Sequence, residues 1–356
     1  MSIGLDDVIA AETALSHVDG EAGRLIIRGH DLEELAGRAS FEDVIAMLWE
    51  GLVPGASADP RARFGEARER AFRHLSPLAE NLSGLTPVEG MRLLLSALPD
   101  ADENPAFLAV GASAVAAAMA IRGAKGLSPV VPDASAGHAA DLLRMITGAP
   151  VDEGSARGLG TYLVTVIDHG LNASTFAARV VASTDAGLLS AVVAGLCALK
   201  GPLHGGAPGP VLDMLDAIGT VDSAEGWLDE AMARGERLMG FGHRIYRVRD
   251  PRADVLKAAA ARLKGDNNRI AFAEAVEQTA LKVLQRRKPG RRLDTNVEFY
   301  TAILLDSLSV PREGFTPLFA AGRTAGWVAH AIEQEKAGRI IRPQSRYVGP
   351  WPAEAA

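Results

Sequence analysis

Three histidines, each beside a glycine, are the residues of this chain best suited to chemistry. In chain order they lie in the segments IDHGLNASTFAAR, KGPLHGGAPGP and GFGHRIYRVRDPR, as His169, His204 and His243. Glycine lets the backbone approach a ligand closely and is common in loops that present side chains. A single histidine is more often structural than catalytic, so it is the glycine context that favours a functional interpretation.

Arginines gather close to the third histidine. Four of them fall within nine residues and are opposed only by Asp250: Arg244, Arg247, Arg249 and Arg252. Arg323 and Arg342 add two guanidinium groups near the C-terminus. Because guanidinium groups pair bidentately with carboxylates and phosphates, the cluster predicts an anion site. A solvated, basic helix start is the alternative interpretation.

One carboxylate, Glu298, begins the apolar run LDTNVEFYTAILL. Thr295-Asn296-Val297-Glu298 fits a capping box, in which a Thr and a Glu three residues later bind each other's backbone amides. The local pattern alone therefore predicts a helix cap. The alternative is a catalytic base, and the two roles exclude each other, because a carboxylate folded back onto the Thr295 amide cannot also face a substrate.

Taken together, these residues suit one kind of reaction. Arginines bind substrate carboxylates, histidines donate to carbonyl oxygens, and a carboxylate removes a proton from carbon. The pattern suggests carbon–carbon bond formation through the enol or enolate of an acyl group, added to a keto acid. The sequence lacks G-x-x-x-x-G-K-[ST], a G-x-G-x-x-G after an expected strand, G-x-S-x-G, and an H-x-x-x-H pair with a nearby Glu. Those absences argue against phosphate-loop, dinucleotide, serine-hydrolase and zinc sites.

Composition limits the class of protein. A length of 356 residues suits one large or two moderate domains, and 48% hydrophobic with 23% charged residues is typical of a globular chain. A net charge of −7 argues against a nucleic-acid partner, and the single cysteine, Cys197, cannot form an internal disulfide. The acidic N-terminus resembles no signal peptide, and the apolar stretch 186–199 is shorter than the ~18–20 residues that span a bilayer. We therefore expect a cytoplasmic protein without membrane association.

Helical patterns dominate the chain. Ser40 is the expected N-cap of a helix over 41–55 that ends at Pro54-Gly55. Strand signals are few, and the clearest predicts a hairpin over 12–29 around the turn 19–23. Further helices are expected over 104–121, 140–148, 224–240, 254–265 and 325–338. We expect a mostly α protein of many packed helices with a short N-terminal β-hairpin.

Six separated segments resemble the citrate synthase family, in the family's order and over nearly the whole chain. They are residues 8–36, HGLNASTFAAR (169–179), GPLHGGA (201–207), GFGHRIYRVRDPRAD (240–254), GRTAGWVAHAIEQ (322–334) and RIIRPQSRYVGP (339–350). The resemblance implies a mostly α, multi-helix fold and the smaller, homodimeric form of the family. It implies a large domain of residues 1–203 and 307–356, and a small domain of residues 204–306 that closes over the cleft.

The resemblance also implies roles for residues matched by position. His204 would bind the thioester carbonyl oxygen, His243 would polarise and protonate the ketone oxygen of oxaloacetate, and Glu298 would be the base. Oxaloacetate would be held by His169, Arg252, Arg323 and, from the partner subunit, Arg342, which makes the dimer obligatory for activity. Coenzyme A would contact Leu238, Met239, Gly240, Phe241, Gly242 and Arg247. No metal or redox cofactor is implied, since the coenzyme A thioester is a substrate.

Two positions depart from the family pattern. The family's base is normally Asp within PNVDFY, whereas this chain has TNVEFY. The extra methylene moves the carboxylate by on the order of 1 Å, a misplacement that can cost ~100-fold in rate. Gly170 stands where the family often has Glu, which weakens the expected support of His169.

Three functions stay open from the sequence. The leading one is citrate synthase, a Claisen-type condensation of acetyl-CoA with oxaloacetate at the entry of the tricarboxylic acid cycle. A 2-methylcitrate synthase that uses propionyl-CoA is close, because one methyl group in a pocket is worth only about 1–3 kcal/mol. A catalytically weakened relative that binds dicarboxylates or CoA has Glu298 as its only support, and the retained histidines and arginines count against it.

Overall fold

The computed structural model describes residues 8–202, 204–205, 208–243, 245–246, 248–263 and 267–352. Within these residues the chain is mostly helical, with one small antiparallel sheet, which confirms the predicted fold class. The strands are β1 (Ser16–Asp19), β2 (Arg24–Ile27) and β3 (His30–Asp31). The helices of the first half are α1 (Leu32–Leu35), α2 (Phe41–Leu48), α3 (Pro60–Leu75), η1 (Ser76–Leu82), α4 (Pro87–Ser96), α5 (Pro105–Gly123), α6 (His138–Thr147) and α7 (Glu153–Val166). Those of the second half are α8 (Ala173–Ala182), α9 (Leu188–Leu199), α10 (Pro208–Ile218), α11 (Val221–Ala233), α12 (Pro251–Ala260), α13 (Asn267–Arg287), α14 (Val297–Ser307), η2 (Arg312–Gly314) and α15 (Phe315–Ala337).

The N-terminal hairpin forms where the turn residues predict it. β1 pairs antiparallel with β2, and Asp19 lies opposite Arg24. Gly23 in the turn has φ +67°, a conformation that glycine adopts without strain. The two-residue strand β3, which the sequence did not predict, adds a third strand beside β2.

Helix bounds follow the predictions unevenly, and the helix expected over 325–338 begins ten residues earlier, at Phe315. The Ser40 side chain accepts a hydrogen bond from the Asp43 amide, so α2 begins at Phe41 as predicted. It ends at Leu48 and not near residue 55, because the chain turns at Gly51, which has φ +71°; the buried Trp49 donates its ring N–H to the Ala325 carbonyl of α15. The predicted end at residue 240 is likewise wrong for α11, which stops at Ala233, two residues before Gly235 with φ +82°.

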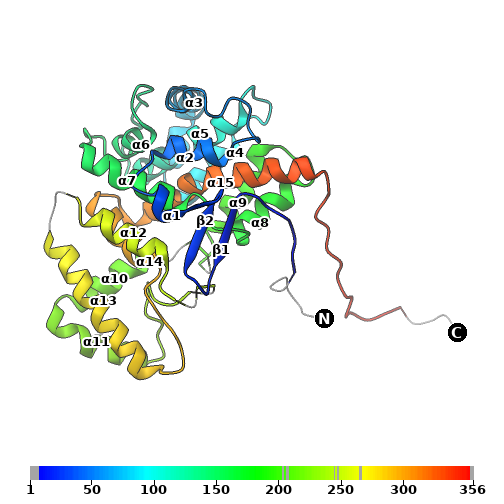
Figure 1. The fold of residues 1–356 in the computed structure, drawn as a ribbon. Coiled ribbons are helices and arrows are strands. Elements are labelled where there is room, and N and C mark those ends of the chain that lie inside the picture. Colours follow the sequence, from blue (N-terminus) through cyan, green and yellow to red (C-terminus); the bar gives the residue numbers. More distant parts are fainter. Residues whose placement is uncertain are drawn as a thin grey trace.

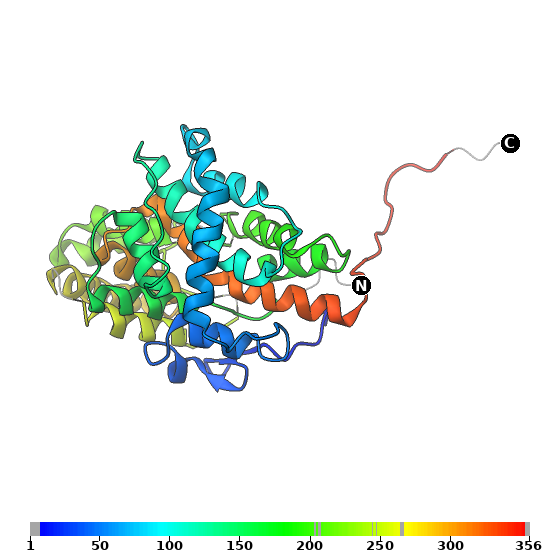
Figure 2. The ribbon, with the colours of Figure 1, turned by 90° about the horizontal axis from the view of Figure 1, so that it is seen from above.

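The long helix α15 runs through the centre of the larger group of helices and packs against α5, α7, α8 and α9 (Figures 1 and 2). Small residues make this possible. A Cβ on Gly322 would overlap Val166, and one on Gly326 would overlap the Ile167 carbonyl. Because α15 approaches the end of α7 so closely, Arg323 is held directly beside the segment 166–169.

Helix α5 is long and apolar enough to cross a membrane by length and composition. In the folded chain 89% of this stretch is buried among other helices, as is typical of the core helix of a globular protein. The stretch 186–199, which was too short to span a bilayer, forms the shorter helix α9, so α5 is the longer apolar helix of the two.

Helices α10 to α14 form a second group, at the lower left of Figure 1. Within it α11 packs on α13, and α14 packs on α10 and α12. Both α12 and α14 also contact α7, so this group meets the larger one at the end of α7. The chain after α15 leaves the body as an extended segment (Figures 1 and 2), with Ile340, Val348 and Trp351 largely exposed.

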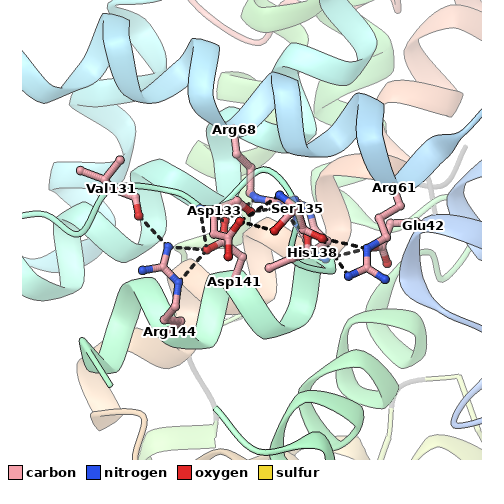
Figure 3. Close-up of polar contacts among 10 residues, drawn as sticks. Glu42, Arg61, Arg68, Val131, Asp133, Ser135, His138, Asp141 and Arg144 are labelled. Carbon is pink, nitrogen blue, oxygen red and sulfur yellow. Dashed lines mark hydrogen bonds and ion pairs between the residues drawn. The ribbon is translucent and has the colours of Figure 1, made fainter. Parts of the chain in front are cut away.

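A buried ionic network fastens the connection between α5 and α6 to α3 (Figure 3). Arg68 of α3 donates its Nε to Asp141 at 2.7 Å, its Nη2 to two backbone carbonyls, and its Nη1 lies 3.3 Å from His138 Nδ1. Asp141 also accepts from the Asp133 amide and from Arg144. Every nitrogen of the Arg68 guanidinium therefore has a partner.

Candidate active site

The segment that follows α7 carries His169, and buried hydrogen bonds hold this segment in place. Asp168, fully buried, accepts hydrogen bonds from the Ser16 hydroxyl and from His330 Nε2 at 3.3 Å. The same Ser16 oxygen accepts from the Gly170 amide at 3.0 Å. Gly170 has φ +61°, so the chain turns sharply directly after His169. Ser16 and His330 thus support the His169 loop from β1 and α15.

His204 follows α9 and faces the start of α8. Its Nε2 lies 2.9 Å from the Ser174 hydroxyl oxygen, which also lies 2.8 Å from Asn172 Oδ1 and accepts from the Trp327 ring N–H at 3.3 Å. Burial, and secondarily the charge of Arg323, lower the pKa of His204 to about 4. The imidazole is therefore neutral at pH 7.

His243 has a defined tautomer. Its Nδ1 accepts hydrogen bonds from the amides of Ile245 at 3.0 Å and Tyr246 at 3.1 Å. Burial, and then the nearby Arg252, lower the pKa of His243 to about 4, so the ring is neutral. A neutral ring whose Nδ1 accepts carries its proton on Nε2, and the Arg252 Nη2, which can only donate, then lies 3.3 Å from Nε2 without a hydrogen bond to it. His243 therefore presents an N–H donor on Nε2.

Asp250 joins the His243 loop to α12 and α14. It caps α12 at the Arg252 amide and binds the Arg252 guanidinium through both carboxylate oxygens, at 3.0 and 2.8 Å. Its Oδ2 also accepts from the Val297 amide at 3.1 Å. Asp250 was noted in the sequence only as a charge opposing the arginines, whereas in the fold it orients one of them.

Glu298 does not form the predicted capping box. Asn296 is the N-cap of α14 and accepts from the Glu298 amide at 3.0 Å. The Thr295 hydroxyl is turned away and donates to buried Glu277 at 2.6 Å. Within the described part of the chain, no hydrogen-bond partner of the Glu298 carboxylate is found. Burial outweighs the stabilising charge of Arg252 and raises the pKa of Glu298 to about 7.

Arg323 is a buried guanidinium with one protein hydrogen bond. Its Nε donates to the Val166 carbonyl at 2.5 Å, and its two terminal amino groups bind no other residue that the structure describes. Burial lowers the pKa of Arg323 to about 10, against the opposing effect of Asp168. A charged group held in this way favours an anion that the protein itself does not supply.

These side chains share one site. The rings of His169 and His243 are 5.7 Å apart. Burial lowers the pKa of His169 well below its usual value, and the charges of Arg252 and Arg323 add to this effect. Glu298 interacts electrostatically with both arginines. The fold thus brings together six predicted site residues from α12, α14, α15 and the loops after α7, α9 and α11.

Tyr246 is a site residue that the sequence reasoning missed. Its hydroxyl lies 3.2 Å from His169 Nε2, and its ring centre lies 4.7 Å from that of His243. The side chain is almost fully buried between the two histidines. Its place between His243 and Arg252 in the sequence was the available signal. Ser174 was likewise present in a quoted motif without a role.

The predicted coenzyme A segment lies between α11 and α12. Gly240 and Gly242 have positive φ, and Leu238 and Phe241 are buried. A cavity of about 250 Å³ opens beside the segment, lined by α10, α11 and residues 236–239, with Met214, Trp227, Leu238 and Met239 in its wall. Arg247 lies outside the described residues.

Arg342 is not brought to this site. It is exposed on the C-terminal segment, directly after Ile341, whose amide donates to the Ser183 hydroxyl at the end of α8 at 3.0 Å. Its predicted role from a partner subunit stays a prediction. The residues that the structure describes contain no group of three or more His, Cys, Asp or Glu side chains that could hold a metal ion.

Comparison with known proteins identifies the family. The family model described as "Citrate synthase, C-terminal domain" matches residues 4–344. "Putative citrate synthase 2" of Mycobacterium tuberculosis is 40% identical, over 98% of this chain and 93% of that protein. Citrate synthase of Haloferax volcanii is 37% identical, over 97% of this chain and 95% of that protein.

Solved structures agree. Citrate synthase of Pyrobaculum aerophilum has a TM-score of 0.86 at 34% identity and covers 99% of this chain and 93% of its own. The Thermoplasma acidophilum citrate synthase, solved as a ternary complex with carboxymethyl coenzyme A and oxaloacetate, has a TM-score of 0.86 at 28% identity, over 99% of this chain and 97% of its own. The chain therefore belongs to the citrate synthase family of transferases.

Proposed function

We propose that Glu298, His204 and His243 carry out the family reaction in this chain: acetyl-CoA, oxaloacetate and water give citrate and coenzyme A. The observation that carries this assignment is the Glu298 carboxylate, which has no hydrogen-bond partner among the described residues and interacts with two buried guanidinium groups, Arg252 and Arg323. A carboxyl group whose pKa is about 7 is a stronger base than an ordinary glutamate. No metal or other cofactor takes part in the proposed steps.

In the first step Glu298 removes a proton from the acyl methyl group, and negative charge moves onto the thioester oxygen. His204 donates a hydrogen bond to that oxygen. This requires the His204 proton on Nδ1, with Nε2 accepting from the Ser174 hydroxyl. Because Asn172 Oδ1 competes for the single Ser174 proton, Ser174 decides which tautomer His204 adopts.

In the second step the enol carbon attacks the ketone carbon of oxaloacetate, and the new alkoxide takes a proton from His243 Nε2. The proton that Glu298 removed from the methyl group then restores the neutral His243 ring. The tautomer that the Ile245 and Tyr246 amides impose supports this role. Water then hydrolyses the resulting thioester, which releases citrate and the coenzyme A thiol. Arg252, Arg323 and His169 bind the oxaloacetate carboxylates and carbonyl.

The domain division remains part of the proposal. A small domain of residues 204–306 is supported by the way α10 to α14 pack on one another, and a large domain of 1–203 and 307–356 by the helices around α15. His204 and Glu298 come from the small domain, whereas His169 and Arg323 come from the large one. Closure of the two domains would complete the site and exclude water. A cytoplasmic location also stays a prediction.

A homodimer that exchanges Arg342 is supported by the extended C-terminal segment, whose Ile340, Val348 and Trp351 are exposed. A mixing experiment tests it. Arg342→Ala and Glu298→Gln are each expected to be inactive, and co-refolded mixed dimers should recover activity, because one site then receives both wild-type residues. If mixed dimers of verified composition stay inactive, Arg342 does not act across the interface.

The test of the reaction is thiol release with oxaloacetate and either acetyl-CoA or propionyl-CoA. Glu298→Gln is expected to lower kcat by about 10³-fold, within the range known for general bases, while oxaloacetate binding is retained. Glu298→Asp shows whether the longer side chain is a handicap or an adaptation. Thiol release by Glu298→Gln equal to that of the wild type would exclude Glu298 as the base. A wild type that binds oxaloacetate without releasing thiol would favour a sensor.

A further inference from the structure

A buried carboxylate of α13, Glu277, binds residues on both sides of the proposed base. Its Oε1 accepts from the Thr295 hydroxyl at 2.6 Å, just before α14, and its Oε2 accepts from the Tyr300 hydroxyl at 2.6 Å, within α14. Arg249 pairs with the same carboxylate at 2.8 Å. Because Glu298 lies between Thr295 and Tyr300 in the chain, Glu277 holds the segment that carries the base.

The pattern Thr-x-x-Glu also occurs at the start of α4, and there it forms a capping box. The Glu89 carboxylate accepts from the Thr86 amide at 3.0 Å and from the Thr86 hydroxyl at 2.6 Å. The hydroxyl and the amide of Thr86 lower the pKa of Glu89 below its ordinary value. A carboxylate that is bound in this way to its own helix start is a weaker base than a free one.

At α14 the box does not form, although its backbone donor is available. The antiparallel bridge at Thr295 is made by the amides of Gly242 and Asn296, so it does not use the Thr295 amide. That amide has no acceptor in the part of the chain that the structure describes. The difference from α4 lies in the hydroxyl, because Thr86 donates to the glutamate of its own helix and Thr295 donates to Glu277 of another helix.

We propose that Glu277 is a positioning residue for the base: it accepts the Thr295 hydroxyl, prevents the capping box, and so leaves the Glu298 carboxylate free to take the acyl proton. This inference rests on the proposed function and adds to it a residue that does not touch the substrate. Two carboxylates compete for one hydroxyl, and burial strengthens the bond to Glu277.

Two substitutions of similar size separate positioning from charge. Glu277→Gln and Glu277→Met both remove the negative charge that pairs with Arg249. Glutamine keeps a carbonyl oxygen that can accept the Thr295 hydroxyl, whereas methionine offers only a weak sulfur acceptor. A positioning role therefore predicts a loss of activity in the methionine variant alone, and an electrostatic role predicts the same loss in both.

The measurement is kcat/KM for oxaloacetate at pH 5.5 and at pH 8. In Glu277→Met the ionised Glu298 can form the box, so the value at pH 8 is expected to fall about tenfold, a factor within the range of helix caps. At pH 5.5 most of Glu298 is protonated in either protein, and the two values should agree within about twofold. Glu277→Gln should stay within about twofold of wild type at both pH values.

The groups that face Glu298 are the same in wild type and in both variants. They are Asp250 and Arg252 at the start of α12, Arg323 of α15 and Tyr162 of α7. Their effects on the titration of Glu298 are therefore shared. A loss that is confined to high pH can then be assigned to a new partner of the ionised carboxylate, whereas a general loss of structure would lower the rate at both pH values.

A second substitution provides a rescue. Thr295→Pro removes both the hydroxyl and the amide hydrogen, so the capping box cannot form. At pH 8 the double variant Glu277→Met/Thr295→Pro should reach a kcat/KM within about threefold of Thr295→Pro alone. If Glu277→Met does not fold, the double variant carries the test. A double variant that stays as slow as Glu277→Met, or that does not fold, would show that Glu277 is needed for something other than preventing the box.

Two further results would overturn the inference and leave the proposed function in place. One is an equal loss in Glu277→Gln and Glu277→Met, and the other is a loss in Glu277→Met that is as large at pH 5.5 as at pH 8. Failure of the proposed function itself is distinguishable, since the wild type would then release no thiol or Glu298→Gln would release it at the wild-type rate.

Discussion

Two buried arginines on different helices of this protein differ in how many hydrogen-bond partners they have. Arg68 has a partner for every guanidinium nitrogen, including the Asp141 carboxylate (Figure 3). Arg323, equally buried, has one backbone carbonyl, and its terminal amino groups bind no residue in the described part of the chain. Burying a charge is costly unless it is paired. We therefore infer that Arg68, whose nitrogens all have partners, stabilises the fold. Arg323, whose terminal amino groups have none among the described residues, is available to bind a ligand.

The carboxylates repeat this contrast. Asp141 accepts from Arg68, from Arg144 and from the Asp133 amide, whereas Glu298 has no described partner and its pKa rises to about 7. The two histidines differ less in protonation, because burial keeps both His138 and His243 neutral. Partners of the charged groups therefore distinguish the two clusters better than burial or residue type does.

The largest expected effect on stability comes from disrupting the cluster around Arg68 and Asp141. Arg68→Met leaves Asp141 buried with a weaker set of partners, and we expect the free energy of unfolding to fall by about 3 kcal/mol. Denaturant unfolding measures it. Arg144→Met is the matched control, since Arg144 binds the same Asp141 from a partly exposed position, and its expected cost is below about 1 kcal/mol. Equal losses of unfolding free energy in the two variants would mean that the full set of Arg68 hydrogen bonds adds no extra stability.

Substitution in the cluster around Arg323 and Glu298 should lower activity and leave stability nearly unchanged. Arg323→Met removes a buried charge that has one protein hydrogen bond, so the free energy of unfolding is expected to stay within about 1 kcal/mol of wild type. The value of kcat/KM for oxaloacetate should fall about 100-fold, as one charged contact with a carboxylate is lost. Unfolding and initial-rate measurements on the same preparation check both. Strong destabilisation with retained affinity would assign Arg323 to structure.

The Glu298 carboxylate, which is proposed to be needed for activity, should lower the stability of the folded protein at high pH. Its pKa is about 7 in the folded protein against an ordinary value of 4.5, so wild-type stability is complete below pH 4.5 and is lost as the pH rises through 7. The neutral variant Glu298→Gln avoids this loss, and we expect it to be more stable by about 2 kcal/mol at pH 8. Melting temperatures at pH 5 and pH 8 would reveal it as a gain that is present only at the higher pH. A variant that is less stable at both values would contradict the unpaired carboxylate.

The smallest effect is a shift in the pH dependence of the rate. As the proposed base, Glu298 must be deprotonated, so kcat/KM for oxaloacetate should fall about tenfold per pH unit below about 7 and be level above it. His204 and His243, whose pKa values are lowered to about 4, stay neutral over this range and add no second limb. Initial rates between pH 5.5 and 8.5 measure the profile. An apparent pKa near 4.5 would show that Glu298 titrates as an ordinary carboxyl group.

Much of the fold was predictable because local signals agreed with tertiary packing. The hairpin turn at 19–23, the Ser40 cap and the apolar helix α5 appear where the sequence placed them. The capping box at Thr295 failed for a physical reason: Glu277 of α13, eighteen residues earlier, accepts the Thr295 hydroxyl, and Asn296 takes over the cap. A buried acceptor from another helix outcompeted the local partner.

For the site, the sequence by itself determined the inventory: which histidines, arginines and carboxylates exist, and that their flanking glycines and caps put them at loops and helix starts. Only the tertiary structure decided which of those groups are left without partners. Tyr246 between two histidines, Asp250 beneath Arg252 and the open guanidinium of Arg323 all depend on elements far apart in the chain. Hydrogen bonds act over about 3 Å, and burial sets their strength, so neither can be derived from spacing along the sequence.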